Sequence, residues 1–192
     1  MILRRLVALL LIAAIGVAVA ALAFDVELPL VGGEGAQEQE ELSKPPALTE
    51  ATTVKEDGLT VGWPEDWSQS RERASLRLQS PDRAVAISVS APAIVKAARG
   101  RRIVLNDALK AIRRNYTRVR VTRGRPGRLD GYPTAQAVVS ARNRNRVPVR
   151  ILVIVAWRKR LAYLVEVFSA ENAPGRRLVE AQTILSSVRL TK

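Results

Sequence analysis

The stretch VRILVIVAWRKRLAYLVEVF, residues 149–168, decides the fold of this chain. It holds two apolar runs, Val149–Trp157 and Leu161–Phe168, joined by three consecutive basic residues. Strands that are apolar on both faces are typical of a sheet that is covered on both sides. The short basic connection predicts a hairpin, so we expect the two runs to pair as neighbouring antiparallel strands.

Further strands are predicted upstream of this hairpin, where apolar residues alternate with polar or small ones. They are expected at Leu59–Trp63, Ala74–Gln79, Ala84–Ser90, Arg118–Thr122 and Thr134–Ala141. The dipeptides Pro81-Asp82 and Asp130-Gly131 mark turns between these strands.

Two helices are predicted from the spacing of apolar residues. The first spans Leu105–Tyr116, and Asn106-Asp107 supply the short polar side chains that are typical of a helix start. The second follows Asn172-Ala173-Pro174 and carries an apolar stripe that includes Leu178 and Leu185. The predicted fold class is therefore α+β, an antiparallel sheet of about six strands with one helix packed on each face.

The first 24 residues predict a membrane segment. Arg4 and Arg5 precede an uncharged apolar run at 6–24, whose 19 residues would span about 28 Å as a helix. One interpretation is an uncleaved signal anchor, a single transmembrane helix. The other is a cleaved signal peptide, because Ala18-Val19-Ala20 and Ala21-Leu22-Ala23 offer small residues at the spacing that signal peptidase reads. In either case everything after the run is exported, as a single-pass membrane protein or a secreted one.

Residues 25–50 form a predicted acidic flexible linker, and residues 51–192 form a predicted basic domain. The linker contains seven acidic residues and one basic residue, with glycines and a Pro45-Pro46 pair that disfavour helix and strand. The domain contains 28 basic and 11 acidic residues, a net charge of +17, whereas the whole chain carries +13. A positive charge of this size favours anionic partners.

Three short segments carry a resemblance to a known family. GLTVGWPEDW at 58–67, ENAP at 171–174 and SSVRL at 186–190 resemble the PsbP-like α/β/α sandwich superfamily. That superfamily includes the extrinsic photosystem II subunit, a nuclear Ran-release factor and bacterial secreted or lipid-anchored proteins of the LpqN type. The resemblance covers about Leu59 to Leu190. It implies a binding or assembly module rather than an enzyme, and it implies no particular site residues.

The composition excludes several kinds of chemistry. The chain has no histidine and no cysteine, which excludes disulfides, thiolate or imidazole metal sites, cysteine nucleophiles and lipid attachment to a cysteine. No glycine-rich phosphate loop, EF-hand or nucleophile elbow is present, so we expect no catalytic residues, no metal site and no cofactor. Glu166 interrupts an apolar strand, where burial would raise its pKa and mark a functional candidate. The alternative is that Glu166 reaches solvent or pairs with an arginine.

Arginine clusters are the main candidate for a binding site. Arg142, Arg144 and Arg146 alternate with asparagines, so in an extended arm their guanidinium groups would lie on one side. The predicted polyanion-binding residues are Arg142, Arg144, Arg146, Arg158, Lys159 and Arg160. Guanidinium groups suit bidentate binding of phosphate or carboxylate. The alternative is compositional, since only 5 of the 28 basic residues of the domain are lysines.

Two tryptophans have alternative interpretations. Pro64 holds Trp63 in an extended conformation, four residues before Trp67. The indole rings either stack on a ligand or pack into the core of the domain, which otherwise contains few aromatic residues.

The sequence thus predicts a membrane-tethered, extracytoplasmic binding or assembly module without enzymatic activity. The expected partners are the membrane, through residues 6–24, and an anionic lipid or acidic envelope polymer, through the arginine clusters. The alternative partner is an unidentified protein held in a salt-tolerant assembly. Nucleic acid is disfavoured, because Trp157 is the only aromatic residue near the basic arms and single strands are held by stacking on several.

Overall fold

The computed structural model describes residue 48 and residues 52–54, 58–72, 75–94 and 97–191. The predicted membrane segment at 1–24 and the predicted linker at 25–50, apart from Leu48, lie outside these residues. Within the described ranges, no helix combines the length and the apolar character needed to cross a membrane.

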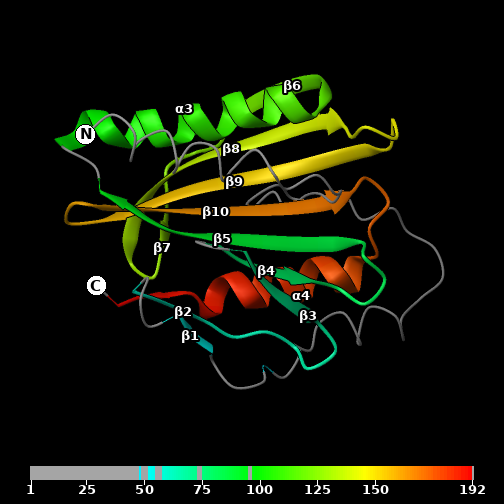
Figure 1. The fold of residues 1–192 in the computed structure, drawn as a ribbon, viewed down its shortest axis with the longest axis horizontal. Helices are drawn as coiled ribbons and strands as arrows, with labels where there is room; N and C mark the ends of the chain where they lie inside the picture. Colours follow the sequence, from blue (N-terminus) through cyan, green and yellow to red (C-terminus); the bar gives the residue numbers. More distant parts are fainter. Residues whose placement is uncertain (1–47, 49–51, 55–57, 73–74, 95–96, 192) are drawn as a thin grey trace.

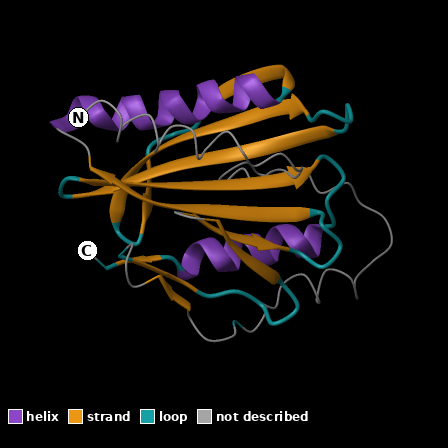
Figure 2. Cartoon of the chain, in the orientation of Figure 1, coloured by secondary structure: helices purple, strands orange, loops and turns teal. Residues whose placement is uncertain are grey.

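The strands are β1 (Thr52–Val54), β2 (Leu59–Val61), β3 (Ser68–Glu72), β4 (Ser75–Gln79), β5 (Val85–Ile94), β6 (Thr117–Arg123), β7 (Gly127–Leu129), β8 (Tyr132–Arg142), β9 (Pro148–Arg158), β10 (Leu161–Ala170) and β11 (Arg189–Leu190). The helices are α3 (Ala97–Asn115) and α4 (Gly175–Ser187). Their arrangement is drawn in Figure 1, and Figure 2 distinguishes helices from strands.

Eight strands form the main sheet, in the order β3-β4-β5-β10-β9-β8-β6, with β7 paired to β8 (Figure 1). Every pair in this sheet is antiparallel. A second sheet of three short strands has the order β1-β2-β11, so the predicted strand at Leu59–Trp63 belongs there and not to the main sheet. The expected sheet of about six strands is therefore too small.

Two strands of the main sheet carry no apolar alternation, which is why they were not predicted. β3 has the sequence SQSRE and is formed by pairing with β4 at the edge of the sheet. β7 has the sequence GRL and pairs with Tyr132–Thr134 around the turn at Asp130-Gly131. Both residues of that turn have positive φ, as a tight hairpin requires.

The hairpin predicted from residues 149–168 is confirmed as the centre of the sheet. β9 and β10 pair in continuous register, from Leu161 opposite Arg158 to Ala170 opposite Val149. All residues at 151–156 and 162–169 are buried. Both faces of these two strands are therefore covered, as their composition predicts.

The first helix begins earlier than predicted. α3 starts at Ala97 and extends through arginines that favour helix, so Asn106 and Asp107 lie inside it and not at its start. The Asp107 carboxylate lies 3.4 Å from Nζ of Lys110 on the next turn. α4 begins as predicted, directly after Pro174.

The two helices cover different parts of the sheet (Figure 1). α3 contacts β6, β8, β9 and β10, whereas α4 contacts β5 and β2. Val165 and Glu166 are consecutive in β10, so their side chains lie on opposite faces of the sheet. Val165 is paired with Ile154 of β9, so these two side chains share a face. Ile154 lines a cavity together with Leu185 of α4, and Glu166 acts electrostatically on Tyr116 at the end of α3. The ends of α3 and α4 therefore lie on opposite faces.

A buried ion network attaches α4 to two loops. Arg177 is 7% exposed as a residue. Its guanidinium lies 2.7 Å from the buried Glu180 carboxylate, and 3.1 Å and 3.0 Å from the exposed carboxylates of Asp66 and Asp82. Burial alone would lower the pKa of Arg177, but hydrogen bonds to the three carboxylates raise it far above its ordinary value. Arg177 is thus held in its charged form and serves the fold, not a partner.

Candidate anion-binding surface and cavity

The six predicted polyanion-binding residues lie at opposite ends of the sheet. Arg142, Arg144 and Arg146 are in or beside the turn between β8 and β9, and the other three are at the turn between β9 and β10. The eleven residues of β9 separate the two turns, a distance of about 33 Å at the rise of a strand. The two groups therefore do not form one site (Figure 1).

The first group does not form the predicted extended arm. Residues 143–147 make a closed turn, in which the Asn143 N–H donates to Val147 O and the Arg146 N–H donates to Asn143 O. The Asn143 side chain also accepts a hydrogen bond from the Val147 N–H, and Arg146 has positive φ. Asparagine forms such turns readily, so the alternation of arginine with asparagine ends the strand and does not extend it.

In the second group, Arg158 has a structural role. Its guanidinium lies over the ring of Tyr132, 5.3 Å from the ring centroid, and Nη1 donates a hydrogen bond to the Leu190 carbonyl. Arg158 thereby attaches the β9–β10 hairpin to β11. Lys159 and Arg160 are exposed at the tip of that hairpin.

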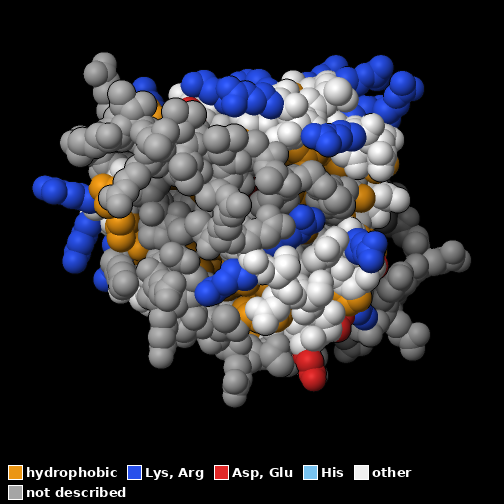
Figure 3. Space-filling model, in the orientation of Figure 1, with side chains coloured by type: hydrophobic (Ala, Val, Ile, Leu, Met, Phe, Trp, Pro, Cys, Tyr) orange, Lys and Arg blue, Asp and Glu red, His pale blue; other side chains and the backbone are white. Residues whose placement is uncertain are grey.

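A larger basic surface is formed by α3, β6 and the β8–β9 turn, and we call it the basic edge. Its described side chains are exposed at Arg102, Lys110, Arg113, Arg114, Arg118, Arg120, Arg123, Arg125, Arg144, Arg146 and Arg150, and half-buried at Arg142. Figure 3 shows lysine and arginine side chains gathered along this side of the molecule, over α3 and β6.

Chain connectivity and strand pairing bring these residues together. α3 ends one residue before β6, and Thr117 at the start of β6 pairs with Arg142 at the end of β8. The last turn of α3, with Arg113 and Arg114, therefore lies near the β8–β9 turn. Arg120, Ser140 and Arg150 stand opposite one another on β6, β8 and β9. Arg150 alternates in step with Ile154 along β9, so Arg120 and Arg150 lie on the sheet face opposite α3 and extend the basic edge around its outer strand.

The charge of the basic edge is almost uncompensated. Segments 97–125 and 142–150 contain fourteen basic residues and one acidic residue, Asp107. Among the described residues, the ion pair of Asp107 with Lys110 is the only one on this surface. Asp66, Asp82 and Glu180 are instead paired with Arg177, away from the basic edge.

The outer strand of the basic edge is irregular. The register of β6 against β8 shifts between Thr117 and Arg120, and Arg118 has positive φ. A β-bulge at a sheet edge disrupts the row of unpaired backbone groups and opposes pairing with a strand of another chain. The basic edge is thus built to present side chains, not backbone, to a partner.

Part of the basic edge could be predicted from the sequence. Lys110, Arg113 and Arg114 lie on the polar face of the predicted helix, and Arg118 and Arg120 flank Val119 in a predicted strand. Their proximity to the Arg142 group depends on β6 pairing with β8 across β7, a non-consecutive arrangement that no local pattern predicts.

The two tryptophans belong to the core. Trp63 and Trp67 are both buried, and Nε1 of Trp67 donates a 2.8 Å hydrogen bond to Oε2 of Glu180. The core-packing interpretation therefore replaces ligand stacking for this pair.

Glu166 is a buried carboxyl group inside the sheet. Glu166 is 5% exposed, and burial raises the pKa of its carboxyl group to about 7. Ser88 is the partner of Glu166 on β5 and is 2% exposed. Tyr116 is 8% exposed and interacts electrostatically with Glu166. The hydroxyl groups of Ser88 and Tyr116 have no hydrogen-bond partner in the described part of the chain. Burial, with a smaller contribution from Glu166, raises the pKa of Tyr116 to about 12.

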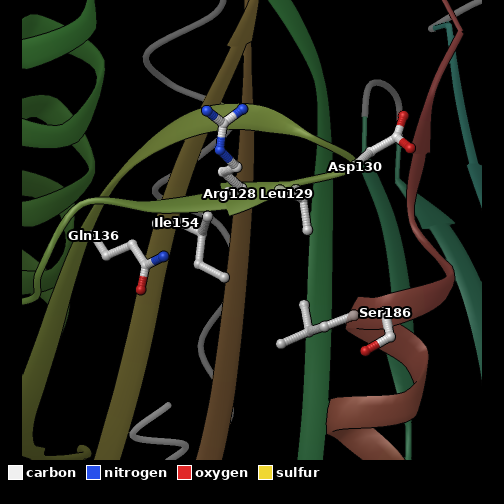
Figure 4. Close-up of a pocket in the computed structure, with 8 residues that line it drawn as sticks. Arg128, Leu129, Asp130, Gln136, Ile154 and Ser186 are labelled. Carbon is white, nitrogen blue, oxygen red and sulfur yellow. The ribbon is translucent and has the colours of Figure 1, made fainter. Parts of the chain in front are cut away.

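A cavity of about 280 Å³ lies between the β7–β8 hairpin and the end of α4 (Figure 4). Its lining residues are Gly127, Arg128, Leu129, Asp130, Gln136, Ile154, Leu185 and Ser186. Leu129, Ile154 and Leu185 are buried, so they form an apolar wall. Within the described residues, no cluster of three or more acidic, histidine or cysteine side chains could hold a metal ion, in this cavity or elsewhere.

Solved structures share this fold. The solution structure of cyanobacterial PsbP (CyanoP) from Synechocystis matches with a TM-score of 0.54 at 13% identity, over 83% of this chain and 98% of that chain. The Ran-binding protein Mog1p of Saccharomyces cerevisiae matches with a TM-score of 0.52 at 9% identity, over 76% of this chain and 97% of that chain. A protein from Bacteroides thetaiotaomicron matches with a TM-score of 0.50 at 10% identity, over 70% of this chain but only 46% of that longer chain.

The chain therefore has the Mog1p/PsbP-like fold, which confirms the resemblance noted in the sequence. No protein-family model matches the sequence, and no curated protein matches it. At identities of 9–13% these likenesses establish the fold alone, and no functional residue is transferred from them.

Proposed function

We propose that this chain is a non-catalytic binding protein whose basic edge holds the phosphate or carboxylate groups of anionic cell-envelope material. Residues 6–24 tether it to the membrane, and the domain lies on the extracytoplasmic side. The observation that carries the proposal is the excess of fourteen basic residues over one acidic residue in segments 97–125 and 142–150. The absence of histidine and cysteine from the sequence supports a non-catalytic role.

The energetics favour a multivalent anionic surface over a single small anion. Exposed, solvated arginines contribute little singly, but each basic residue near an anionic surface adds about 1 kcal/mol of attraction. A predicted linker of 26 residues has a root-mean-square reach of about 28 Å, which keeps the domain close to the lipid headgroups. Several arginines can therefore act together.

The test compares two variants of the full chain in nanodiscs of neutral lipid. The edge variant is Arg113→Gln, Arg120→Gln, Arg144→Gln and Arg150→Gln. The control variant is Arg71→Gln, Arg83→Gln, Lys159→Gln and Arg160→Gln, which removes the same charge from exposed residues elsewhere. The probes are polyphosphate, polygalacturonate and vesicles that contain phosphatidylglycerol, so phosphate, carboxylate and lipid sources are measured separately.

We expect the edge variant to lose at least about tenfold in affinity at moderate salt, and the control less than about threefold. The slope of log affinity against log salt should fall by about 3 for the edge variant, by analogy with counterion release from nucleic acids. Equal losses in both variants, or binding to every probe that is independent of salt, would show that the basic edge is not the site.

A salt-tolerant protein partner is the second candidate. It is favoured by two exposed apolar side chains, Ile94 at 80% and Ile103 at 54%, and by the description of Mog1p as a Ran-binding protein. Crosslinking of the full chain in cells, with and without Ile94→Asp and Ile103→Asp, tests it. A crosslinked protein that disappears in the double variant and persists in high salt supports this candidate.

A further inference from the structure

We propose that the cavity between β7 and α4 binds a small uncharged molecule that has an apolar body and one hydrogen-bond donor. This site is separate from the basic edge, so the inference does not depend on the proposed function. The wall of the cavity, its polar groups and its volume support this inference.

The wall offers an apolar contact surface. Leu129 comes from β7, Ile154 from β9 and Leu185 from α4, so three separate elements converge on the cavity. In Figure 4, Leu129 projects from β7 into the space beside Ile154. These side chains offer carbon atoms and no hydrogen-bonding groups to the cavity, so an apolar ligand suits its wall better than water does.

Gln136 supplies an oriented acceptor at one side of the wall. Its Nε2 donates a 2.9 Å hydrogen bond to Thr134 Oγ1, which also accepts from the Gly127 N–H at 3.2 Å. A Cβ atom at position 127 would lie 2.5 Å from Gln136 Nε2, so glycine there leaves room for this amide. The bond to Thr134 fixes the orientation of the amide, and Figure 4 shows Oε1 turned away from β7, where it can accept a hydrogen bond from a ligand.

Two charged side chains lie at the rim of the cavity, and neither faces its apolar wall as a free charge. Arg128 Nη1 donates to the Gly131 carbonyl at 2.6 Å, and Arg128 projects from β7 away from Leu129 (Figure 4). Asp130 accepts from the Leu190 N–H at 2.8 Å and lies 3.8 Å from Arg189. The Arg128 charge faces away from the apolar wall and the Asp130 charge is paired with Arg189, so a charged ligand seated against that wall would lose hydration without a counter-charge facing it.

The volume sets the size of the ligand. At roughly 30 Å³ for each water molecule, 280 Å³ corresponds to about nine waters, near the lower limit of ligand pockets. A bicyclic aromatic molecule is smaller than this volume and fits within it. Indole carries a single N–H donor on an apolar body, and 1-methylindole has the same shape without the donor.

The test uses the full chain in nanodiscs with labelled isoleucine and leucine methyl groups. Indole, 1-methylindole, benzoate and benzylamine are titrated while the methyl signals of Leu129, Ile154 and Leu185 are recorded. Ser186→Phe places a large side chain at the mouth of the cavity. Gln182→Phe makes the same change one turn earlier on α4, at an exposed position outside the cavity, and serves as its control.

We expect indole to shift the three methyl signals in a saturable manner, with a Kd below about 1 mM, and the two charged probes to cause no shift. Loss of one hydrogen bond should weaken 1-methylindole by about threefold to tenfold, although it partitions more strongly into lipid. Gln136→Leu should remove this difference between the two indoles. Ser186→Phe should weaken indole at least about tenfold, and Gln182→Phe should not.

Two outcomes would overturn the inference. The first is the absence of a saturable shift at these methyl groups with every probe. The second is a shift that is unchanged by Ser186→Phe, because the molecule would then bind elsewhere. Failure here leaves the basic edge untested, and failure of the polyanion experiment leaves this cavity unaffected.

Discussion

The indole Nε1 of Trp67 donates a 2.8 Å hydrogen bond to Oε2 of Glu180, which also lies 2.7 Å from Nη1 of Arg177. This contact joins the loop after β2 to the middle of α4, 113 residues later. A tryptophan that could have faced a ligand is thus part of the buried network that positions α4.

The first prediction concerns the centre of that network. Arg177→Met should lower the free energy of unfolding by about 3–5 kcal/mol, because it removes the buried cation of the network and leaves the buried Glu180 with only the exposed Arg176. Urea unfolding of the full chain measures the change. Arg176→Met is the control, since Arg176 is exposed and its ion pair with Glu180 should contribute less than about 1 kcal/mol. Equal effects of both substitutions would contradict the prediction.

The second prediction concerns the pH dependence of stability. The pKa of Glu166 is about 7 in the folded chain, compared with 4.5 as its ordinary value. Between these pH values the unfolded chain ionises this group and the folded chain does not, so stability falls as pH rises. The accumulated loss is about 3 kcal/mol above pH 7.

Glu166→Gln should therefore be more stable than the parent by about 3 kcal/mol at pH 8 and nearly equal to it at pH 4. Denaturant unfolding at both pH values provides the measurement. Glu65→Gln alters an exposed carboxyl and should change neither value. A stability gap that is the same at both pH values would mean that Glu166 does not titrate in this window.

The third prediction separates structure from binding at the β9–β10 hairpin. Arg158→Met should lower stability by about 1–3 kcal/mol, because it removes the hydrogen bond to Leu190 and the contact with Tyr132. Lys159→Met, at the exposed tip, should have almost no effect on stability. Neither substitution should alter polyanion affinity more than about threefold, and a larger loss for Arg158→Met alone would assign it to the binding site.

The fourth prediction concerns the turn between β7 and β8. Gly131 has φ of +75° and open space around it, so only backbone strain opposes a side chain there. Gly131→Ala should cost about 1 kcal/mol, and Gly131→Asn less, because asparagine tolerates the left-handed conformation. Thermal unfolding distinguishes the two. A lower stability for the asparagine variant would point to a steric clash instead.

The parts of the fold that could be predicted are those in which side-chain burial follows the chain locally. β9 and β10 are apolar on both faces, and their short connection leaves no arrangement other than a hairpin. β3 is formed by pairing with the edge of β4. Its sequence, SQSRE, contains no apolar residue that would predict this pairing. The start of α3 was misplaced because Asn106 is compatible with a helix interior when the preceding arginines already favour helix.

The candidate site could be predicted only in its composition. The sequence shows that arginine is abundant and that Arg142, Arg144 and Arg146 are close together. The directions of their side chains depend on the turn that Asn143 closes, which the sequence did not reveal. Arg158 could not be told from Lys159 without the positions of Tyr132 and Leu190, which are distant in sequence. The cavity depends on a gap between β7 and α4, which is a property of tertiary packing.

The length of β9 has a mechanical consequence. It acts as a rigid spacer of about 33 Å between two cationic tips that point in opposite directions along the sheet. A short anionic oligomer held at the β8–β9 turn therefore cannot reach Lys159 and Arg160 at the same time.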